Sequence, residues 1–214
     1  MKLQGRYFFN QLKFCPMLSR SKRQMNIEFV GNPSRWPSAG HRRYRLRRRQ
    51  PASAFRAACG GRRRDIARDP FASPSEFDAY IEGTSATLMW AAALALGADP
   101  AAETAFRALG WAAGLASYLR AVPVLTARNL LPLYDPDPKA LRILAGEGLN
   151  HLAIARRQRA AFGQAGPAAL AAWQAGPLLR QAYANPTRVA EGTLALSEFS
   201  KRGSLVWMGL TGRF

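Results

Sequence analysis

The stretch of sequence that decides the fold is Ala105–Leu133, which reads AFRALGWAAGLASYLRAVPVLTARNLLPL. Apolar residues recur in it at spacings of three and four, which predicts a helix with one face turned to a core. The residues of this apolar face are Leu109, Ala112, Ala116 and Leu119. Another face carries small residues that leave room for a neighbouring helix or an apolar ligand, namely Gly110, Ala113, Gly114 and Ser117.

The helix is predicted to end at Pro123, because proline has no N–H to continue the hydrogen-bond ladder. Arg120 would then lie in the last turn, where the helix dipole favours a cation. The loop that follows carries Arg128 and closes on Leu131 and Pro132.

This pattern resembles the squalene/phytoene synthase family, whose members join two prenyl diphosphates head to head. The family writes the region roughly as L-G-x-A-x-Q-L-T-N-I-L-R-D-V-x-E-D, followed shortly by G-R-x-Y-L-P. The positions that agree are Leu109, Gly110, Ala112, Leu115, Leu119, Arg120, Val122, Arg128, Leu131 and Pro132. Where the family has the three acids of its second aspartate-rich motif, the chain has Ala121, Val124 and Leu125.

The loss of these acids bears directly on the family's chemistry. Magnesium is held by carboxylates together with substrate phosphates, and it neutralises charge on the leaving diphosphate. The chain has no acidic residue between Glu103 and Asp135. We therefore predict no metal site and no catalytic residue, and magnesium is expected only if the chain is an active enzyme. The family has a branch without these motifs, resembling the mitochondrial assembly factor for respiratory complex I, and the chain looks most like that branch.

The resemblance implies four binding residues. Arg120 and Arg128 match family arginines near the diphosphates, and a guanidinium can bind phosphate through two parallel hydrogen bonds. An ion pair or a helix-end cation is an equally open interpretation of both. The segment YIEGTSATLMW resembles the family's Y-x-x-G-x-x-G helix, with Tyr80 and Gly83 in place. A glycine inside a helix costs about 1 kcal/mol relative to alanine, so Gly83 indicates close packing or a ligand wall.

Basic residues are concentrated in the first third of the chain, whose 214 residues carry a net charge of +18. Residues 1–64 contain 17 basic residues and one acid, and residues 65–214 contain 14 and 12. We therefore divide the chain into a basic segment, 1–64, and a helical domain, 65–214.

Three interpretations of residues 1–64 remain open: a basic arm for anionic lipid or nucleic acid, a disordered tail, and a truncated or frame-shifted reading of the gene. We favour the last. The sequence changes abruptly at Arg62–Phe71, RRRDIARDPF, which resembles the family's R-R-x-D-x-x-x-x-P-F segment. The resemblance is expected to cover roughly residues 62–210.

Helix-capping signals recur after residue 72. A helix is predicted to start at Ser73-Pro74 and stop at Gly97, and others to start at Asp99-Pro100 and Asp137-Pro138. A further helix over Pro167–Ala184 should kink or break into two at Pro177, and a last one follows Asn185-Pro186. The apolar positions of the helix that starts at Asp137-Pro138 are Ile143, Leu144, Leu149, Leu152, Ile154 and Ala155. In the helix over Pro167–Ala184 the residues expected to face inward are Leu170, Trp173, Leu178 and Tyr183. The last helix contains Val189, Leu194, Leu196, Phe199 and Leu205–Leu210. The fold class is all-α, an isoprenoid-synthase-like bundle that is incomplete.

His151 has Glu147 four residues before it on a predicted helix, which is the spacing of a metal-ligand pair. No second pair is evident from the sequence, so a hydrogen-bonded or surface histidine is the preferred interpretation. No run reaches the roughly 18 apolar residues of a membrane span.

The sequence thus predicts a non-catalytic squalene/phytoene synthase-like protein. It would act as an assembly or interaction factor, or bind a prenyl diphosphate or other isoprenoid lipid at the membrane face. One alternative is a magnesium-dependent prenyltransferase, and another is a basic-armed nucleic-acid binder. The nucleic-acid binder is disfavoured because the net charge of residues 65–214 is close to zero. The expected location is cytoplasmic, or peripheral to the inner face of the membrane, with a protein partner or the membrane surface as contacts.

Overall fold

The computed structural model describes residue 65 and residues 69–211. All of them belong to one compact unit. The basic segment 1–64, and the interpretations that concern it, lie outside the described residues.

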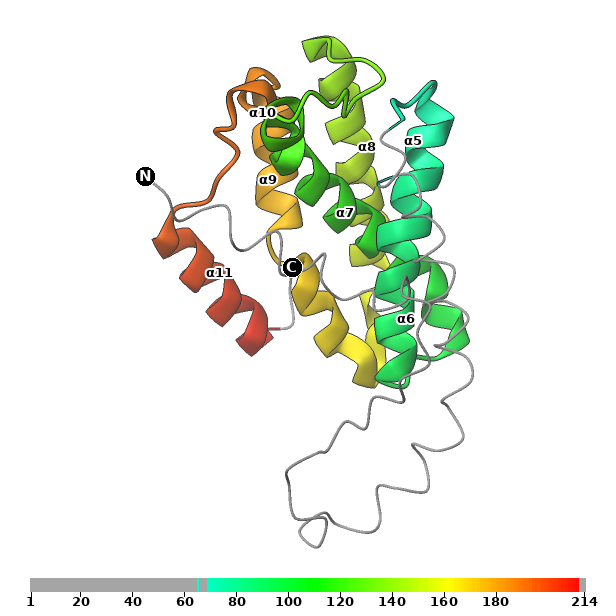
Figure 1. The fold of residues 1–214 in the computed structure, drawn as a ribbon. Coiled ribbons are helices and arrows are strands. Elements are labelled where there is room, and N and C mark those ends of the chain that lie inside the picture. Colours follow the sequence, from blue (N-terminus) through cyan, green and yellow to red (C-terminus); the bar gives the residue numbers. More distant parts are fainter. Residues whose placement is uncertain (1–64, 66–68, 212–214) are drawn as a thin grey trace, which may run out of the picture. The chain divides into compact units, whose positions relative to one another are not determined.

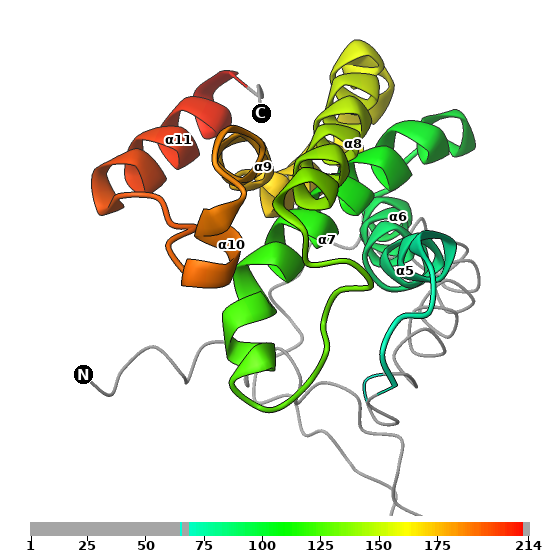
Figure 2. The same cartoon turned by 90° about the horizontal axis from the view of Figure 1, so that it is seen from above.

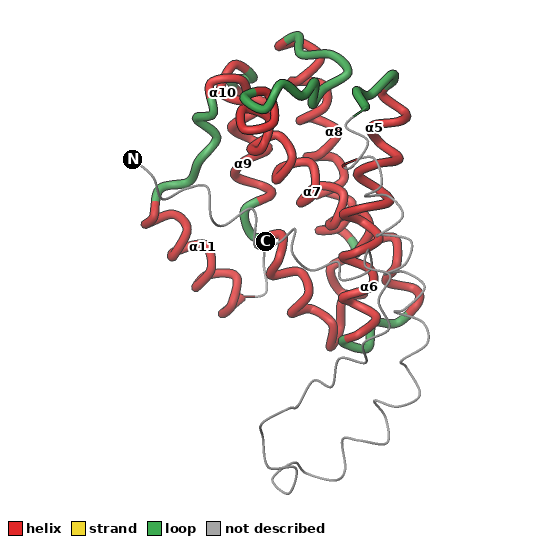
Figure 3. Tube along the Cα trace, in the orientation of Figure 1, coloured by secondary structure: helices red, strands yellow, loops and turns green. Residues whose placement is uncertain are grey.

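The described part of the chain is built from helices, as Figures 1 and 3 show. In chain order the elements are α5 (Pro74–Ile81), the π-helical turn η2 (Glu82–Ala86), α6 (Thr87–Ala95), the 3₁₀ turn η3 (Pro100–Ala102), α7 (Glu103–Thr126), α8 (Pro138–Arg157), the 3₁₀ segment η4 (Arg159–Ala172), α9 (Ala175–Ala184), α10 (Thr187–Glu191) and α11 (Glu198–Thr211). No strand occurs between residues 69 and 211, which confirms the all-α prediction.

The first helical stretch begins and ends where the sequence predicts. The Ser73 hydroxyl accepts a hydrogen bond from the Glu76 N–H at 3.2 Å, and Gly97 ends the stretch with a φ of 89°. A side-chain cap and a left-handed glycine satisfy backbone groups that the helix itself leaves open. The π-helical turn in the middle was not predicted.

Helix α7 is the centre of the bundle, with α6, α8 and α9 around it (Figure 2). It follows a 3₁₀ turn capped by Asp99, whose carboxylate accepts the Ala101 N–H at 2.9 Å. Its largest side chains are almost fully buried: Phe106, Leu109, Trp111, Leu115 and Leu119. The helical run Pro100–Thr126 is long and apolar enough to cross a membrane by length and composition, although no such run was expected. Its apolar window is 61% buried among its neighbours, so its apolar side chains already serve the core.

The small-residue face of α7 packs on the π-helical turn. A Cβ atom at Gly110 would lie 2.5 Å from the Met89 Cβ and 2.8 Å from the Ala86 Cα. A Cβ atom at Gly114 would overlap Ser85. The room left by these glycines is therefore taken by a neighbouring helix.

The prediction that this helix ends at Pro123 is wrong, because α7 continues to Thr126. A proline inside a helix removes one backbone hydrogen bond and disfavours the helix, but here the turn after it still forms. The Thr126 hydroxyl donates to the Val122 carbonyl at 3.0 Å, and the Ala127 N–H to the Pro123 carbonyl at 3.0 Å. As a result, Arg120 does not lie in the last turn.

Of the two later helices, one breaks into two as the sequence allowed, a few residues before the proline, and the other divides although no break was predicted. The helix expected over Pro167–Ala184 divides at Trp173 and Gln174, and Pro177 lies in the first turn of α9, where its missing N–H costs little. The last helix divides into α10 and α11, since Gly192 ends α10 with a φ of 72°. Leu170 and Tyr183 were expected to face inward but are exposed, as are Ile143 and Ile154 among the apolar positions of α8.

Candidate functional site

The four predicted binding residues lie on two sides of α7. Tyr80 belongs to α5 and packs on Tyr118 of α7, with ring centroids 5.9 Å apart. Arg120 is two residues further along α7, which corresponds to about 200° around the helix. It donates to the Gln174 side chain at 3.0 Å, just before α9.

Tyr80 is connected to the loop that follows α7. Its hydroxyl donates to the Asp65 carboxylate at 2.7 Å, and its ring also contacts Phe71. The Tyr118 hydroxyl donates to the Pro132 carbonyl at 2.7 Å, which fixes the end of the loop that carries Arg128. The structure therefore places Tyr80 and this loop on the α5 side of α7.

Gly83 lies inside the π-helical turn. There the Thr87 N–H and hydroxyl both donate to the Glu82 carbonyl, five residues back. Such turns insert an extra residue into a helix and occur often at functional sites. Gly83 is half-buried and belongs to the element against which the α7 glycines pack.

Arg128 is exposed in the turn after α7, and its N–H donates to the Leu125 carbonyl at 3.0 Å. The two arginines are thus held by different elements.

A polar cluster that the sequence analysis missed surrounds Trp111, and we call it the His151 cluster. The indole N–H of Trp111 donates to the Asp78 carboxylate at 2.7 Å. Its ring stacks on the imidazole of His151, with centroids 4.3 Å apart and planes 17° from parallel. The remaining members are Glu82 and Glu147, whose charges act on His151.

The environment keeps the imidazole neutral. Burial lowers the pKa of His151, and the attraction of Asp78, Glu82 and Glu147 offsets only part of that effect. The His151 Nδ1 atom is buried and has no hydrogen-bond partner in the part of the chain that is described. A buried nitrogen of this kind can accept or donate one further hydrogen bond.

Arg107 neutralises part of the negative charge beside the His151 cluster. Arg107 pairs with Glu82 at 2.7 Å and with Glu103 at 2.6 Å. Burial opposes its charge, but the hydrogen bonds and charges of these two carboxylates outweigh burial and raise the pKa of Arg107. Burial, followed by the charges of Glu147 and Asp135, raises the pKa of Tyr134.

The sequence carried a signal for the His151 cluster. Asp78 and Glu82 are four residues apart, as are Glu147 and His151, and the analysis found only the second pair. Two such pairs on neighbouring helices are typical of a metal site. Among the described residues, however, no group of three or more His, Cys, Asp or Glu side chains converges closely enough to hold a metal ion.

The residues at the end of α7 do not fit magnesium either. Ala121 is buried, Val124 is 54% exposed and Leu125 is half-buried, so none offers an oxygen ligand from its side chain. Magnesium requires such oxygens.

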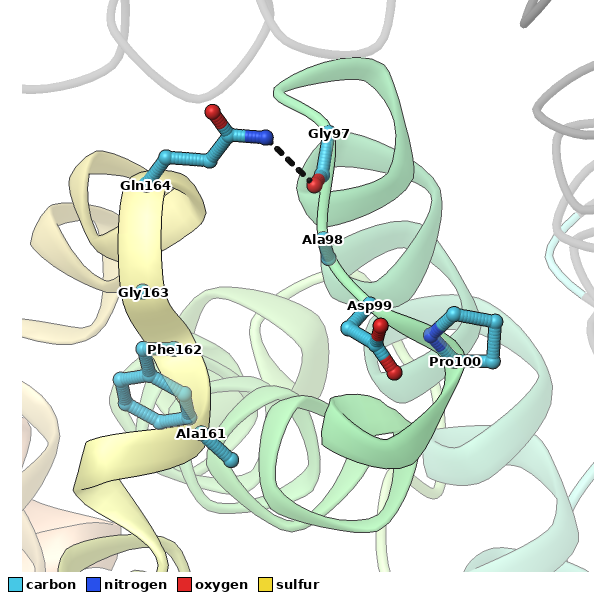
Figure 4. Close-up of a pocket in the computed structure, with 8 residues that line it drawn as sticks. All are labelled: Gly97, Ala98, Asp99, Pro100, Ala161, Phe162, Gly163 and Gln164. Carbon is cyan, nitrogen blue, oxygen red and sulfur yellow. Dashed lines mark hydrogen bonds between the residues drawn. The ribbon is translucent and has the colours of Figure 1, made fainter.

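A pocket of about 270 Å³ lies between the α6–η3 turn and η4 (Figure 4). The Gln164 amide donates to the Gly97 carbonyl across it at 3.0 Å. Its carboxylate, Asp99, already caps the helix start. None of the predicted binding residues lines it.

Comparison with known proteins gives one match. Residues 38–134 match the model of the squalene/phytoene synthase family. The matched region begins at residue 38 rather than 62, and it ends at 134 rather than 210. No curated protein and no solved structure matches the chain significantly. The segment from residue 38 to the loop after α7 is therefore similar to squalene and phytoene synthases.

Proposed function

We propose that the chain is a non-catalytic member of the squalene/phytoene synthase family that binds a prenyl diphosphate or related isoprenoid lipid without converting it. The observation that carries this proposal is the end of α7, where Ala121, Val124 and Leu125 replace the family's acids. Ionising an allylic diphosphate needs a metal to neutralise the leaving group, and these side chains cannot hold one.

Groups suited to binding are still present beside α7. The rings of Phe71, Phe77, Tyr80 and Tyr118 form an aromatic cluster with centroid distances of 5.0 to 6.3 Å. The loop carrying Arg128 is attached to this cluster through Tyr118. An isoprenoid tail against the rings and a diphosphate near the loop would use both groups.

Separate arginine variants test this binding mode. We expect Arg128→Ala to weaken farnesyl diphosphate binding about tenfold, since a charge-assisted hydrogen bond contributes about 1.5–3 kcal/mol. Arg120→Ala should have a smaller effect, because Arg120 faces α9. Titration calorimetry with farnesyl diphosphate measures both. Unchanged affinity in an Arg120→Ala, Arg128→Ala double variant would remove the anion-binding part of the proposal.

We propose that helix α11 is the part of the chain that contacts the membrane. Its exposed apolar residues follow helical spacing, with Phe199 88%, Val206 62%, Trp207 60% and Leu210 81% exposed. Intervals of seven, eight and eleven residues place them on one face. Lys201 and Arg202 lie on the same helix. A short helix with an aromatic, apolar face and flanking basic residues is typical of binding to an anionic lipid surface.

Vesicle sedimentation tests this surface. A Phe199→Ser, Leu210→Ser variant should lose binding to phosphatidylglycerol vesicles, and Ile143→Ser should not, although Ile143 is 66% exposed on α8. Phosphatidylcholine vesicles should bind more weakly, since they lack the negative charge. Vesicle binding that survives the double substitution, or a dimer that the substitution dissolves, would contradict a membrane contact at α11.

The family match favours a second candidate, a magnesium-dependent prenyltransferase. Its acids would have to come from outside the described residues. The resemblance to the complex I assembly branch supports a role as an assembly or interaction factor instead, with a cytoplasmic or peripheral membrane location. A nucleic-acid binder receives no support from the described helices.

A further inference from the structure

Helix α8 lies at the edge of the bundle, against α7 and α9 (Figure 2). On its outward side, successive exposed residues are separated by four, three, four and three positions, a spacing that places side chains in one row along a helix. The row consists of Ile143, Glu147, Asn150, Ile154 and Arg157, and all five are exposed. Rows with this spacing form the seams between paired helices.

Gly146 presents bare backbone beside this row. A Cβ atom there would lie 3.4 Å from the Cε2 atom of Tyr183 on α9, which is an ordinary van der Waals distance. The described part of the chain therefore leaves room for alanine at this position, although glycine is less favourable than alanine inside a helix. The exposed ring of Tyr183 and this bare backbone form a contact point that an aliphatic side chain of another helix can cover.

The charges of the row favour a second copy of the same helix in antiparallel orientation. Parallel pairing about a two-fold axis would place Glu147 beside Glu147 and Arg157 beside Arg157, and like charges repel. Antiparallel pairing that crosses near Asn150 instead brings Glu147 within about one helical turn of Arg157 in the second copy, a gap that their long side chains span. Two-fold symmetry provides this opposite-charge contact twice.

The same crossing also pairs the uncharged groups. Ile154 of the second copy would lie level with Gly146 and the neighbouring Tyr183. Asn150 would meet its own copy at the axis, where two side-chain amides can exchange hydrogen bonds. The row therefore offers matching apolar, polar and charged contacts to a second copy of itself.

We propose that the outward face of α8 joins two copies of the chain as an antiparallel helix pair. The face is one helix wide, and interfaces of this size are weak, so we expect a dissociation constant of about 10–100 µM. The contact involves neither α11 nor the loop that carries Arg128, so it is independent of the prenyl-lipid and membrane proposals.

Sedimentation velocity of the full chain, without lipid, at about 1–300 µM tests this pairing. We expect Glu147→Arg and Arg157→Glu each to weaken dimerisation about tenfold, because each variant places like charges in contact twice. The double variant reverses both members of the pair and should regain the affinity of the natural chain. Arg142→Glu is the matched control and should leave dimerisation unchanged, because the Arg142 side chain on the same helix donates to the Ala184 carbonyl at 3.4 Å, away from the row.

Two further variants test the contact at Gly146. Gly146→Ala should raise the melting temperature of the monomer, because alanine favours a helix. It should also weaken dimerisation about threefold, because the methyl group stands where Ile154 of the second copy packs. Ile154→Ser should weaken dimerisation about tenfold, since each copy loses a buried aliphatic side chain, while circular dichroism shows the helices intact.

A chain that remains monomeric at about 300 µM would overturn the proposal. Single charge reversals that leave dimerisation unchanged, or a double reversal as weak as either single one, would contradict the antiparallel pairing of Glu147 with Arg157. A dimer that is lost in Phe199→Ser, Leu210→Ser but kept in Ile154→Ser would place self-association at α11 and overturn its assignment to α8.

Discussion

Helices α7 and α11 share several residue types but have opposite surroundings. Both combine a tryptophan, glycines and aliphatic residues: α7 has Trp111 and Gly110, and α11 has Trp207 and Gly203. Trp111 is 2% exposed and Trp207 is 60% exposed. A Cβ atom would collide with neighbours at Gly110 and meet nothing within 4 Å at Gly203.

The contrast shows that apolar composition does not determine which helix is the core. Helix α7 is covered on several sides by α6, α8, α9 and η2. Helix α11, in contrast, leaves most of its apolar stripe exposed. The same residue types therefore stabilise the fold in one helix and are proposed to bind a surface in the other.

Replacing the two tryptophans, one in each helix, should give the largest difference in the free energy of unfolding. Trp111→Ala should lower the free energy of unfolding by about 3–5 kcal/mol, since it leaves a cavity and removes the hydrogen bond to Asp78. Trp207→Ala should cost less than about 1 kcal/mol, because exposed substitutions act weakly. Denaturant unfolding measures both, and equal costs would contradict the assigned burial.

Substituting Gly110 and Gly203 should give a smaller difference in stability. Gly110→Ala should destabilise the fold by about 1–3 kcal/mol, because the methyl group meets the α6 and η2 backbone. Gly203→Ala should stabilise it by about 0.5–1 kcal/mol, since alanine favours a helix and has space. Thermal melting distinguishes the two directions. A stabilising Gly110→Ala would mean that α7 and η2 do not pack as closely as the structure places them.

The His151 cluster predicts the smallest effect, a pH dependence of stability. Burial lowers the pKa of His151 in the folded chain, so the unfolded chain takes up a proton first as the pH falls. Stability should therefore decrease from about pH 7.5 through the ordinary histidine pKa of about 6.5 and level off below the folded-state value. Since the ring is half exposed to solvent, the change should stay below about 1 kcal/mol.

His151→Phe provides the comparison for this effect. The variant keeps a ring to stack on Trp111 and cannot titrate, so its stability should fall less over the same pH range. Unfolding measured at several pH values gives the difference. A variant with the same slope as the natural chain would assign the pH dependence to other groups.

Local signals predicted much of the fold. Ser73, Asp99 and Gly97 act through hydrogen bonds or backbone angles within a few residues, and the structure has these features where they were expected. The Leu109–Leu119 stripe is also buried, because α7 is surrounded by other helices.

Features that depend on neighbours were harder to predict. Pro123 was expected to end α7, but the Pro123 carbonyl still accepts the Ala127 N–H and the helix continues to Thr126. Tyr183 was expected to face inward but is exposed, because periodicity shows only that residues share a face, not which face is covered. The contact of Trp111 with Asp78 joins residues 33 positions apart, so it does not follow from spacing in one helix.

The most direct test of the central claim is to incubate the full chain with farnesyl or geranylgeranyl diphosphate and magnesium while measuring binding and pyrophosphate release together. The account predicts saturable binding of the prenyl diphosphate with no release of pyrophosphate at any magnesium concentration, because Ala121, Val124 and Leu125 provide no metal ligand at the end of α7. Magnesium-dependent release of pyrophosphate, or formation of any condensed product, would contradict it.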